Sequence, residues 1–202
     1  MFLLSKLILI RHGQSVWNAE NRFTGWTDVD LSEKGIKEAE EAGNELRSQV
    51  INVVHTSDLI RAKRTAEIVI RANVSSRDTV TKSDWRLNER NYGALQGLNK
   101  AETAEKHGAE QVRIWRRSFD VAPPEGESLE MTAKRTIPYF EEEIIPDLES
   151  GVSVLVSAHG NSLRSIVMHI EGIPPKDIVS FEIQTGVPRY YDYSNGELIL
   201  ID

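Results

Sequence analysis

The stretch that decides the fold is residues 7–15, LILIRHGQS, in which four consecutive apolar residues run into Arg11, His12 and Gly13. A short unbroken apolar run is typical of a β-strand that is buried on both faces of a sheet. Residues 154–162, VLVSAHGNS, repeat the pattern, because a second apolar run ends at His159, followed by a glycine, a polar residue and a serine. If the two strands are neighbours in one sheet, His12 and His159 face each other across a few ångströms.

Outward from these stretches, strand patterns alternate with helix patterns. The strands are predicted at 7–10, 50–54, 80–82, 152–156, 181–183, 189–193 and 198–201. The helices are predicted at 31–48, 58–71, 98–119, 127–149 and 162–171. This alternation favours βαβ units, so we expect an α/β fold, a three-layer α/β/α sandwich with a mostly parallel central sheet. In such sheets ligands bind beyond the carboxyl ends of the strands.

Local signals predict where some helices begin and break. Ser32 is the expected N-cap of the helix at 31–48, and Ser57 or Asp58 is the expected cap of the helix at 58–71. Pro138 is expected to interrupt the helix at 127–149. The length of 202 residues fits one domain, which could carry an elaborated lid.

Composition excludes several classes of protein. The chain has no cysteine, which rules out a disulfide scaffold, a thiolate zinc site and a cysteine nucleophile. No apolar run approaches the roughly 20 residues that cross a bilayer. The apolar N-terminal residues 1–10 continue directly into Arg11 without a small-residue cleavage site, which disfavours a signal peptide. We therefore expect a cytoplasmic protein without a membrane partner.

The charge is uneven along the chain. The formal net charge is -7, so a nucleic-acid partner is not expected. Residues 82–117 nevertheless hold eight Lys or Arg and five Asp or Glu, a local surplus of three positive charges. A basic segment in an acidic protein is consistent with a small anionic ligand in a cleft, and equally with chance unevenness of helix faces.

The strand predicted at 50–54 is followed by a helix that carries Arg61 and Arg64 in its first turns. Helix N-termini bind anions, and guanidinium groups match phosphate oxygens two at a time, so a phosphate site led by Arg61 is expected near Arg11 and the histidines. A metal site is disfavoured because the neighbours of the histidines are Arg11, Gln14 and Asn161 rather than carboxylates. The G-x-S-x-G elbow of a serine hydrolase is absent from the sequence.

Phosphoryl transfer through a nucleophilic histidine fits this set best. A neutral imidazole attacks phosphorus and forms a phosphohistidine, while arginines and the second histidine stabilise the oxygens of the phosphoryl group. Glu89 is the candidate acid that protonates the leaving oxygen, with a surface Glu–Arg pair as the alternative. Cations around Glu89 would lower its pKa and burial would raise it, and the sequence does not decide between them.

The motif at 9–15 resembles the opening signature of the histidine phosphatase superfamily. Four further segments are more specific and resemble the cofactor-dependent phosphoglycerate mutases. They are residues 17–26, WNAENRFTGW; residues 85–100, ending in YGALQGLNK; residues 115–120, WRRSFD; and residues 158–164, AHGNSLR. Together with the motif at 9–15, they extend the similarity over about residues 5–193. The resemblance implies one phosphoglycerate mutase-like domain over 1–202, with 84–125 as a lid over the substrate pocket. It also implies 2,3-bisphosphoglycerate as the priming phosphoryl donor, no metal, and phosphoglycerates as substrates in glycolysis and gluconeogenesis.

The resemblance assigns roles to two sets of residues. The catalytic set is His12 as the phosphorylated nucleophile, Glu89 as general acid and base, and His159, Arg11 and Arg61 as ligands of the phosphoryl group. The substrate-binding set is Ser15, Asn18, Thr24, Gly25, Arg90, Tyr92, Lys100, Arg116, Arg117, Gly160 and Asn161.

Some alternatives stay open at this point. A histidine phosphatase that acts on small phosphomonoesters would share His12, although such enzymes generally lack the set Tyr92, Lys100, Arg116 and Arg117. A bisphosphoglycerate mutase is a further alternative, and Ser15 argues against it because those enzymes tend to have glycine there. Relatives often carry a long loop after Asp120 that contributes to subunit contacts, and this chain lacks it. A homo-oligomer is therefore compatible with the sequence, and its oligomeric state is left open.

Overall fold

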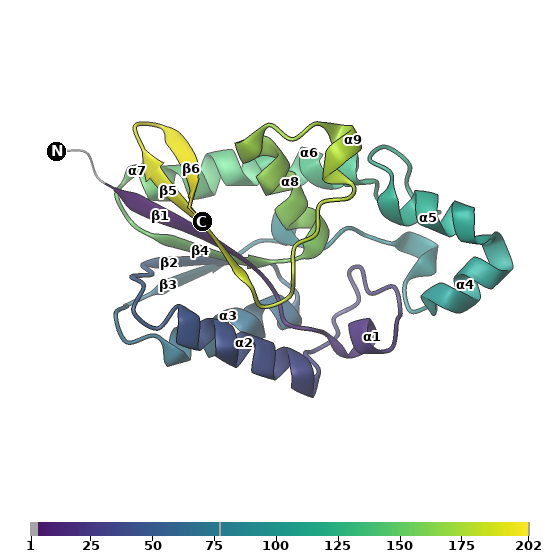
Figure 1. Ribbon diagram of the computed structural model, residues 1–202, viewed down its shortest axis with the longest axis horizontal. Helices are drawn as coiled ribbons and strands as arrows, with labels where there is room; N and C mark the ends of the chain where they lie inside the picture. The colour runs from purple at the N-terminus through teal and green to yellow at the C-terminus, as the bar shows by residue number, and fades with distance from the viewer. Residues whose placement is uncertain (1–3, 77, 202) are drawn as a thin grey trace.

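The computed structural model describes residues 4–76 and 78–201, which form a six-stranded sheet with helices on both faces (Figure 1). The strands lie in the order β3-β2-β4-β1-β5-β6. Their bounds are β1 Ser5–Arg11, β2 Val53–Thr56, β3 Val80–Ser83, β4 Val154–Ala158, β5 Pro188–Ser194 and β6 Glu197–Ile201. β1 to β4 are parallel, and β5 and β6 add an antiparallel edge. The predicted sandwich with a mostly parallel sheet is confirmed.

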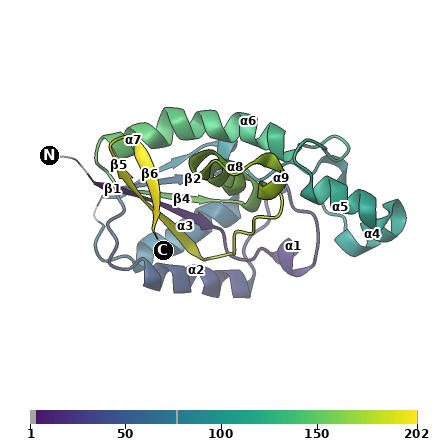
Figure 2. The ribbon, with the colours of Figure 1, turned by 45° about the horizontal axis from the view of Figure 1, so that its top comes forward.

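The central strands β1, β2 and β4 pack alternate side chains into the two layers of helices. Leu7 and Leu9 of β1 face α6 (Leu129–Tyr139), α7 (Ile145–Glu149) and α8 (Gly160–Glu171). Ile8 and Ile10 of the same strand face α2 (Glu33–Glu45) and α3 (Ile60–Ala72). Figure 2 shows these two layers above and below the sheet. The continuous apolar run at 7–10 is thus buried on both faces, as its pattern predicts.

Two sequence-based predictions, a helix cap and a strand, were wrong. α3 begins at Ile60 with Leu59 as its N-cap and no side-chain cap, so neither Ser57 nor Asp58 has the expected role. Residues 181–183 form no strand, because β5 already pairs with β1 as far as Pro188, opposite Ile10. The loop before β5 instead crosses the carboxyl end of β1. The N-cap at Ser32 is confirmed, since its hydroxyl accepts from the N–H of Gly35.

Pro138 does not interrupt its helix. It lies inside α6, and the irregularity follows it as a π-helical turn over Phe140–Ile144. In a regular α-helix, residues eight apart differ by about 80° around the axis, and the extra residue of a π-turn brings them to within about 20°. Tyr139 and Asp147 therefore reach the same buried ring, His55 on β2, at 2.7 and 2.8 Å. This histidine has a structural partner on each nitrogen.

The helix predicted at 98–119 is divided into α4 (Lys100–His107) and α5 (Ala109–Arg117). Gly108 separates them with a φ of 87°, a left-handed conformation that glycine adopts without strain. The two helices project beyond the end of the sheet (Figure 1). Short elements complete the described chain: α1 Val16–Ala19, α9 Pro175–Ile178, and 3₁₀ turns at Trp85–Leu87 and Gly93–Leu95.

Candidate active site

The two His-Gly motifs meet because β1 and β4 are parallel neighbours. Arg11 lies opposite Ala158 in the register, so His12 and His159 follow at the same edge of the sheet. Their ring centroids are 4.9 Å apart and their planes are inclined by 61°. The main chain at Gly13 passes so close to α2 that a Cβ at this position would lie 2.1 Å from the Gly35 carbonyl oxygen. The glycine after His12 is therefore a steric requirement of the turn.

The ring of His12 is fixed as one tautomer. Nδ1 lies 2.6 Å from the carbonyl oxygen of Gly13, which can only accept, so Nδ1 carries the hydrogen and Nε2 keeps its lone pair. Burial lowers the pKa of the His12 imidazole well below its ordinary value, and the charges of Arg61 and Arg11 lower it further. A neutral ring with a free Nε2 is the form that can attack phosphorus.

The tautomer of His159 follows from Ser57. The Ser57 hydroxyl accepts from the N–H of Leu59 at 3.2 Å and lies 2.7 Å from His159 Nε2. Its single hydrogen has no other acceptor in the part of the chain that the structure describes, so it is donated to Nε2 and the ring hydrogen lies on Nδ1. Nδ1 is buried without a partner among these residues, and burial lowers the pKa of this histidine too. Ser57 was expected only as a possible helix cap, and no local signal in the sequence indicates this contact.

Arg11 and Arg61 are held by backbone carbonyls. Within residues 4–76 and 78–201, neither arginine forms a salt bridge with a carboxylate. Arg61 donates to Gly25 at 2.7 Å and to Thr27 at 3.0 Å, and Arg11 donates to Ile183 at 2.9 Å. Burial lowers the pKa of Arg61 to about 10, so it stays charged at neutral pH. Arg64, by contrast, forms an ion pair with Asp30 outside the cavity.

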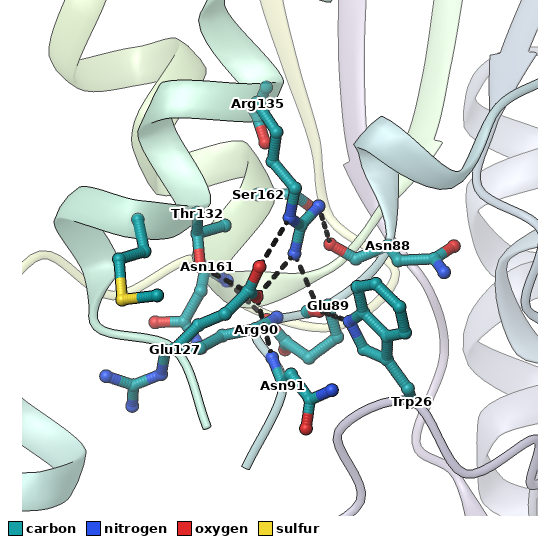
Figure 3. Close-up of polar contacts among 12 residues, drawn as sticks. Trp26, Asn88, Glu89, Arg90, Asn91, Glu127, Thr132, Arg135, Asn161 and Ser162 are labelled. Atoms are coloured by element: carbon teal, nitrogen blue, oxygen red, sulfur yellow. Dashed lines mark hydrogen bonds and ion pairs between the residues drawn. The ribbon is translucent and has the colours of Figure 1, made fainter. Parts of the chain in front are cut away.

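Glu89 lies in the same site with its carboxylate and its main chain both fixed (Figure 3). Oε1 accepts from the N–H groups of Arg90 at 2.8 Å and Asn161 at 3.0 Å. Burial by itself would raise the pKa of Glu89, but these hydrogen bonds and the charges of Arg11 and Arg61 outweigh it, and the pKa lies below its ordinary value. The question that the sequence left open is decided in favour of the charges.

The backbone of Glu89 is positioned by two side chains that lie outside the predicted set. Its carbonyl accepts from Trp26 Nε1 at 2.6 Å and from Arg135 at 2.9 Å, as Figure 3 shows. Arg135 also donates to Asn88 at 2.9 Å and forms an ion pair with Glu127 at 2.8 Å. No local pattern in the sequence indicates that Trp26 or Arg135 contacts the main chain of Glu89.

These groups line a cavity of about 680 Å³, including the solvent at its mouth. Of the predicted site residues, those on its wall are Arg11, His12, Asn18, Thr24, Gly25, Arg61, Glu89, Tyr92, Lys100, Arg116, Arg117, Gly160 and Asn161. Ser15, Arg90 and His159 are buried behind it. Ser15 caps α1, and Arg90 donates to Tyr92 and to the Arg116 carbonyl, both at 3.0 Å.

The wall also includes Arg22, Phe23, Arg164 and Glu182, which the sequence did not indicate. In all it carries seven Arg or Lys and two Glu, a formal surplus of five positive charges. The hydroxyl of Thr24 is buried without a hydrogen-bond partner among the described residues. The distal part of the wall, formed by Tyr92, Lys100, Arg116 and Arg117, comes from α4, α5 and the loop before them. The arrangement suits a ligand with more than one anionic group.

The described residues hold no group of three or more His, Asp or Glu side chains placed to bind a metal ion. No helix within residues 4–76 and 78–201 has the length and apolar character needed to cross a membrane.

Comparisons with known proteins agree with this geometry. The model of the histidine phosphatase superfamily (branch 1) matches residues 7–200. The chain is 49% identical to a 2,3-bisphosphoglycerate-dependent phosphoglycerate mutase of Protochlamydia amoebophila, over 96% of this chain and 97% of that one. It is 50% identical to the protein of the same name from Cytophaga hutchinsonii, over 94% and 88%.

Solved structures share the fold. Bacillus stearothermophilus YhfR is 26% identical, with a TM-score of 0.84 over 97% of this chain and 95% of that one. The phosphoglycerate mutase of Bacillus anthracis is 20% identical, with a TM-score of 0.81 over 100% and 93%, a similarity that shows the fold alone.

Proposed function

The chain belongs to branch 1 of the histidine phosphatase superfamily and, within it, to the 2,3-bisphosphoglycerate-dependent phosphoglycerate mutases, and from that premise we propose how its residues interconvert 3-phosphoglycerate and 2-phosphoglycerate. The observation that carries the proposal is the neutral His12, with a free Nε2, on the wall of a cavity with five surplus positive charges. His12 is the nucleophile that accepts and returns the phosphoryl group.

The charge that develops on the phosphoryl oxygens is stabilised by groups already in place. Arg11 and Arg61 present guanidinium groups that are fixed by backbone carbonyls, so little reorganisation accompanies the reaction. His159 offers the hydrogen on Nδ1, because Ser57 holds the opposite nitrogen as an acceptor. Fixed donors of this kind typically contribute about 10²–10³ in rate each.

Glu89 moves the proton of the sugar-acid hydroxyl. Its lowered pKa makes it a carboxylate at neutral pH, the form that accepts a proton when a hydroxyl of phosphoglycerate attacks phosphohistidine. In the opposite direction it returns that proton to the leaving oxygen. A dianionic phosphoryl group next to Glu89 offsets the charges of Arg11 and Arg61, which raises its pKa toward the value a proton donor needs.

The distal cations fit the second anionic group of the ligand. 2,3-bisphosphoglycerate supplies the phosphoryl group that primes His12, and its total of about five negative charges matches the surplus on the wall. Lys100, Arg116 and Arg117 would hold the carboxylate and the second phosphate, with Tyr92 beside them. A ligand held at both ends is retained while it reorients, which a phosphatase does not need.

The part of the chain at 84–125, which includes α4 and α5, acts in this proposal as the lid of the pocket. We also propose that the enzyme works in the cytoplasm, where glycolysis supplies its substrates. The absence of a nucleic-acid partner stays a prediction.

The test measures conversion of 3-phosphoglycerate to 2-phosphoglycerate in EDTA, with and without 2,3-bisphosphoglycerate, and with His12→Ala as the inactive control. We expect turnover that survives chelation, rises with the bisphosphate and disappears in the variant. Release of inorganic phosphate from simple monoesters without isomer formation would make the protein a phosphatase instead.

A further inference from the structure

The cavity contains an acidic side chain that the proposed reaction does not use. Glu182 lies in the loop between α9 and β5, with Oε1 2.6 Å from Nη2 of Arg117 and Oε2 3.5 Å from Nη2 of Arg164. All three side chains line the same cavity. A carboxylate in a pocket for anions repels the ligand. Its presence on the wall therefore needs an explanation of its own.

Glu182 distinguishes Arg117 from the other distal cations. Within residues 4–76 and 78–201, no carboxylate forms a salt bridge with Lys100 or Arg116. Burial lowers the pKa of Lys100, and the charges of Arg116 and Arg11 lower it further, as expected for cations that repel one another. Of these three cations, Arg117 is the one that has a carboxylate partner in a salt bridge within the part of the chain that the structure describes.

The loop is fixed on both sides of Glu182, while its carboxylate can turn away. Arg164 Nε donates to the Phe181 carbonyl at 2.6 Å, and Arg11 donates to the Ile183 carbonyl at 2.9 Å. The Glu182 side chain is 57% exposed. Exposed ion pairs are weak, so the carboxylate can exchange Arg117 for water at little cost.

We propose that Glu182 tunes the affinity of the pocket by competing with the carboxylate of the substrate for Arg117. The inference rests on the proposed function and deepens it. A phosphohistidine with about two negative charges and a phosphoglycerate with about three together balance the surplus of five on the wall, and this surplus already counts Glu182 as an anion. Removing that charge leaves one cation in excess and holds the ligand longer. Glu182 therefore weakens phosphoglycerate binding and shortens its stay in the pocket.

The experiment compares Glu182→Gln with Glu110→Gln. Both variants replace one carboxylate by an amide, so they change the net charge equally. Glu110 serves as the control because it is exposed, pairs with Arg113 at 2.6 Å and lies outside the cavity wall. Calorimetry in a His12→Ala background gives the Kd of 3-phosphoglycerate without turnover. Active enzyme gives KM and kcat.

For Glu182→Gln we expect a Kd and a KM that are roughly three- to sixfold lower, a kcat that does not rise, and no change in the control. The difference should shrink at 0.5 M salt, because the ion pair is screened. It should vanish when Arg117→Ala is added, since the effect acts through that guanidinium.

Weaker binding in Glu182→Gln would show that the carboxylate positions Arg117 for the ligand and would overturn the proposal. An effect equal to that of Glu110→Gln, or one that persists in the Arg117→Ala background, would overturn it as well. The Kd does not depend on catalysis, so a wild type without mutase activity would reject the proposed function and leave this comparison intact.

Discussion

Acidification should destabilise this protein through His12 and His159, the two buried histidines of the candidate site. The His12 side chain is 2% exposed and His159 is fully buried, and burial is the largest cause that lowers both pKa values well below the ordinary value. In the unfolded chain each ring binds a proton near pH 6.5. The unfolded state then holds more protons than the folded state, so the free energy of unfolding falls as the pH drops below 6.5.

The magnitude follows from the proton balance. A ring that stays neutral when folded loses about 1.4 kcal/mol of stability between pH 7.5 and 5.5, so His12 and His159 together account for about 3 kcal/mol. His55, whose pKa burial also lowers, adds to this loss. The depressed pKa of Glu89 contributes only at lower pH, because stability from a depressed carboxylate is lost below its unfolded pKa, about 4.5. A loss of 3 kcal/mol is a large part of the 5–15 kcal/mol typical of a domain.

The assay measures the free energy of unfolding in urea at pH 7.5, 6.5 and 5.5, with tryptophan fluorescence as the signal. His12→Gln removes one titrating ring, so its loss over this range should be smaller than that of the wild type by about 1.4 kcal/mol. His107→Gln, at an exposed position on α4, serves as the matched control and should lose as much as the wild type. Equal losses in His12→Gln and the wild type would refute the reasoning.

Three substitutions test the site itself. Ser57→Ala should lower kcat about 5- to 100-fold by freeing the His159 tautomer, and it should shift the ring-nitrogen NMR signals of His159. Ser157→Ala is the control, because this buried serine donates to the Ala62 carbonyl at 2.9 Å, and it should change neither. Glu89→Gln keeps the shape but not the proton acceptor, so kcat should fall about 10²–10⁴-fold, while the Kd should not rise because an anionic charge is removed from the pocket; a kcat near wild type would remove Glu89 from the mechanism. Arg61→Lys cannot reach Gly25 and Thr27 together, and we expect single-turnover phosphorylation of His12 to slow at least tenfold; an unchanged rate would assign phosphoryl binding to other groups.

The central part of the site could be predicted because its residues follow a topological rule. His12 and His159 end similar apolar runs, and the carboxyl ends of parallel strands lie at one edge of a sheet. The basic segment that contains Lys100 and Arg116 was visible as a charge pattern, and it forms the distal wall of the cavity. Such patterns are local or periodic, so one chain suffices to read them.

Other features depend on contacts between distant segments. Ser57 and His159 are 102 residues apart, and Arg135 reaches the main chain of Glu89 from a helix 46 residues further on. Glu182 lies within residues 181–183, which were predicted as a strand and form a loop. No pattern in the sequence indicates that a loop carries it to Arg117.

The sequence by itself determined the layered α/β fold, the meeting of the two His-Gly motifs at one edge of the sheet and the cationic character of the pocket, since periodic burial, strand ends and charge are properties of short segments. Only the tertiary structure decided which nitrogen of each histidine is free, which of two opposing effects sets the pKa of Glu89, and which arginine has an internal carboxylate partner. Each of these depends on distances of a few ångströms between separate segments, and packing rather than local order sets those distances.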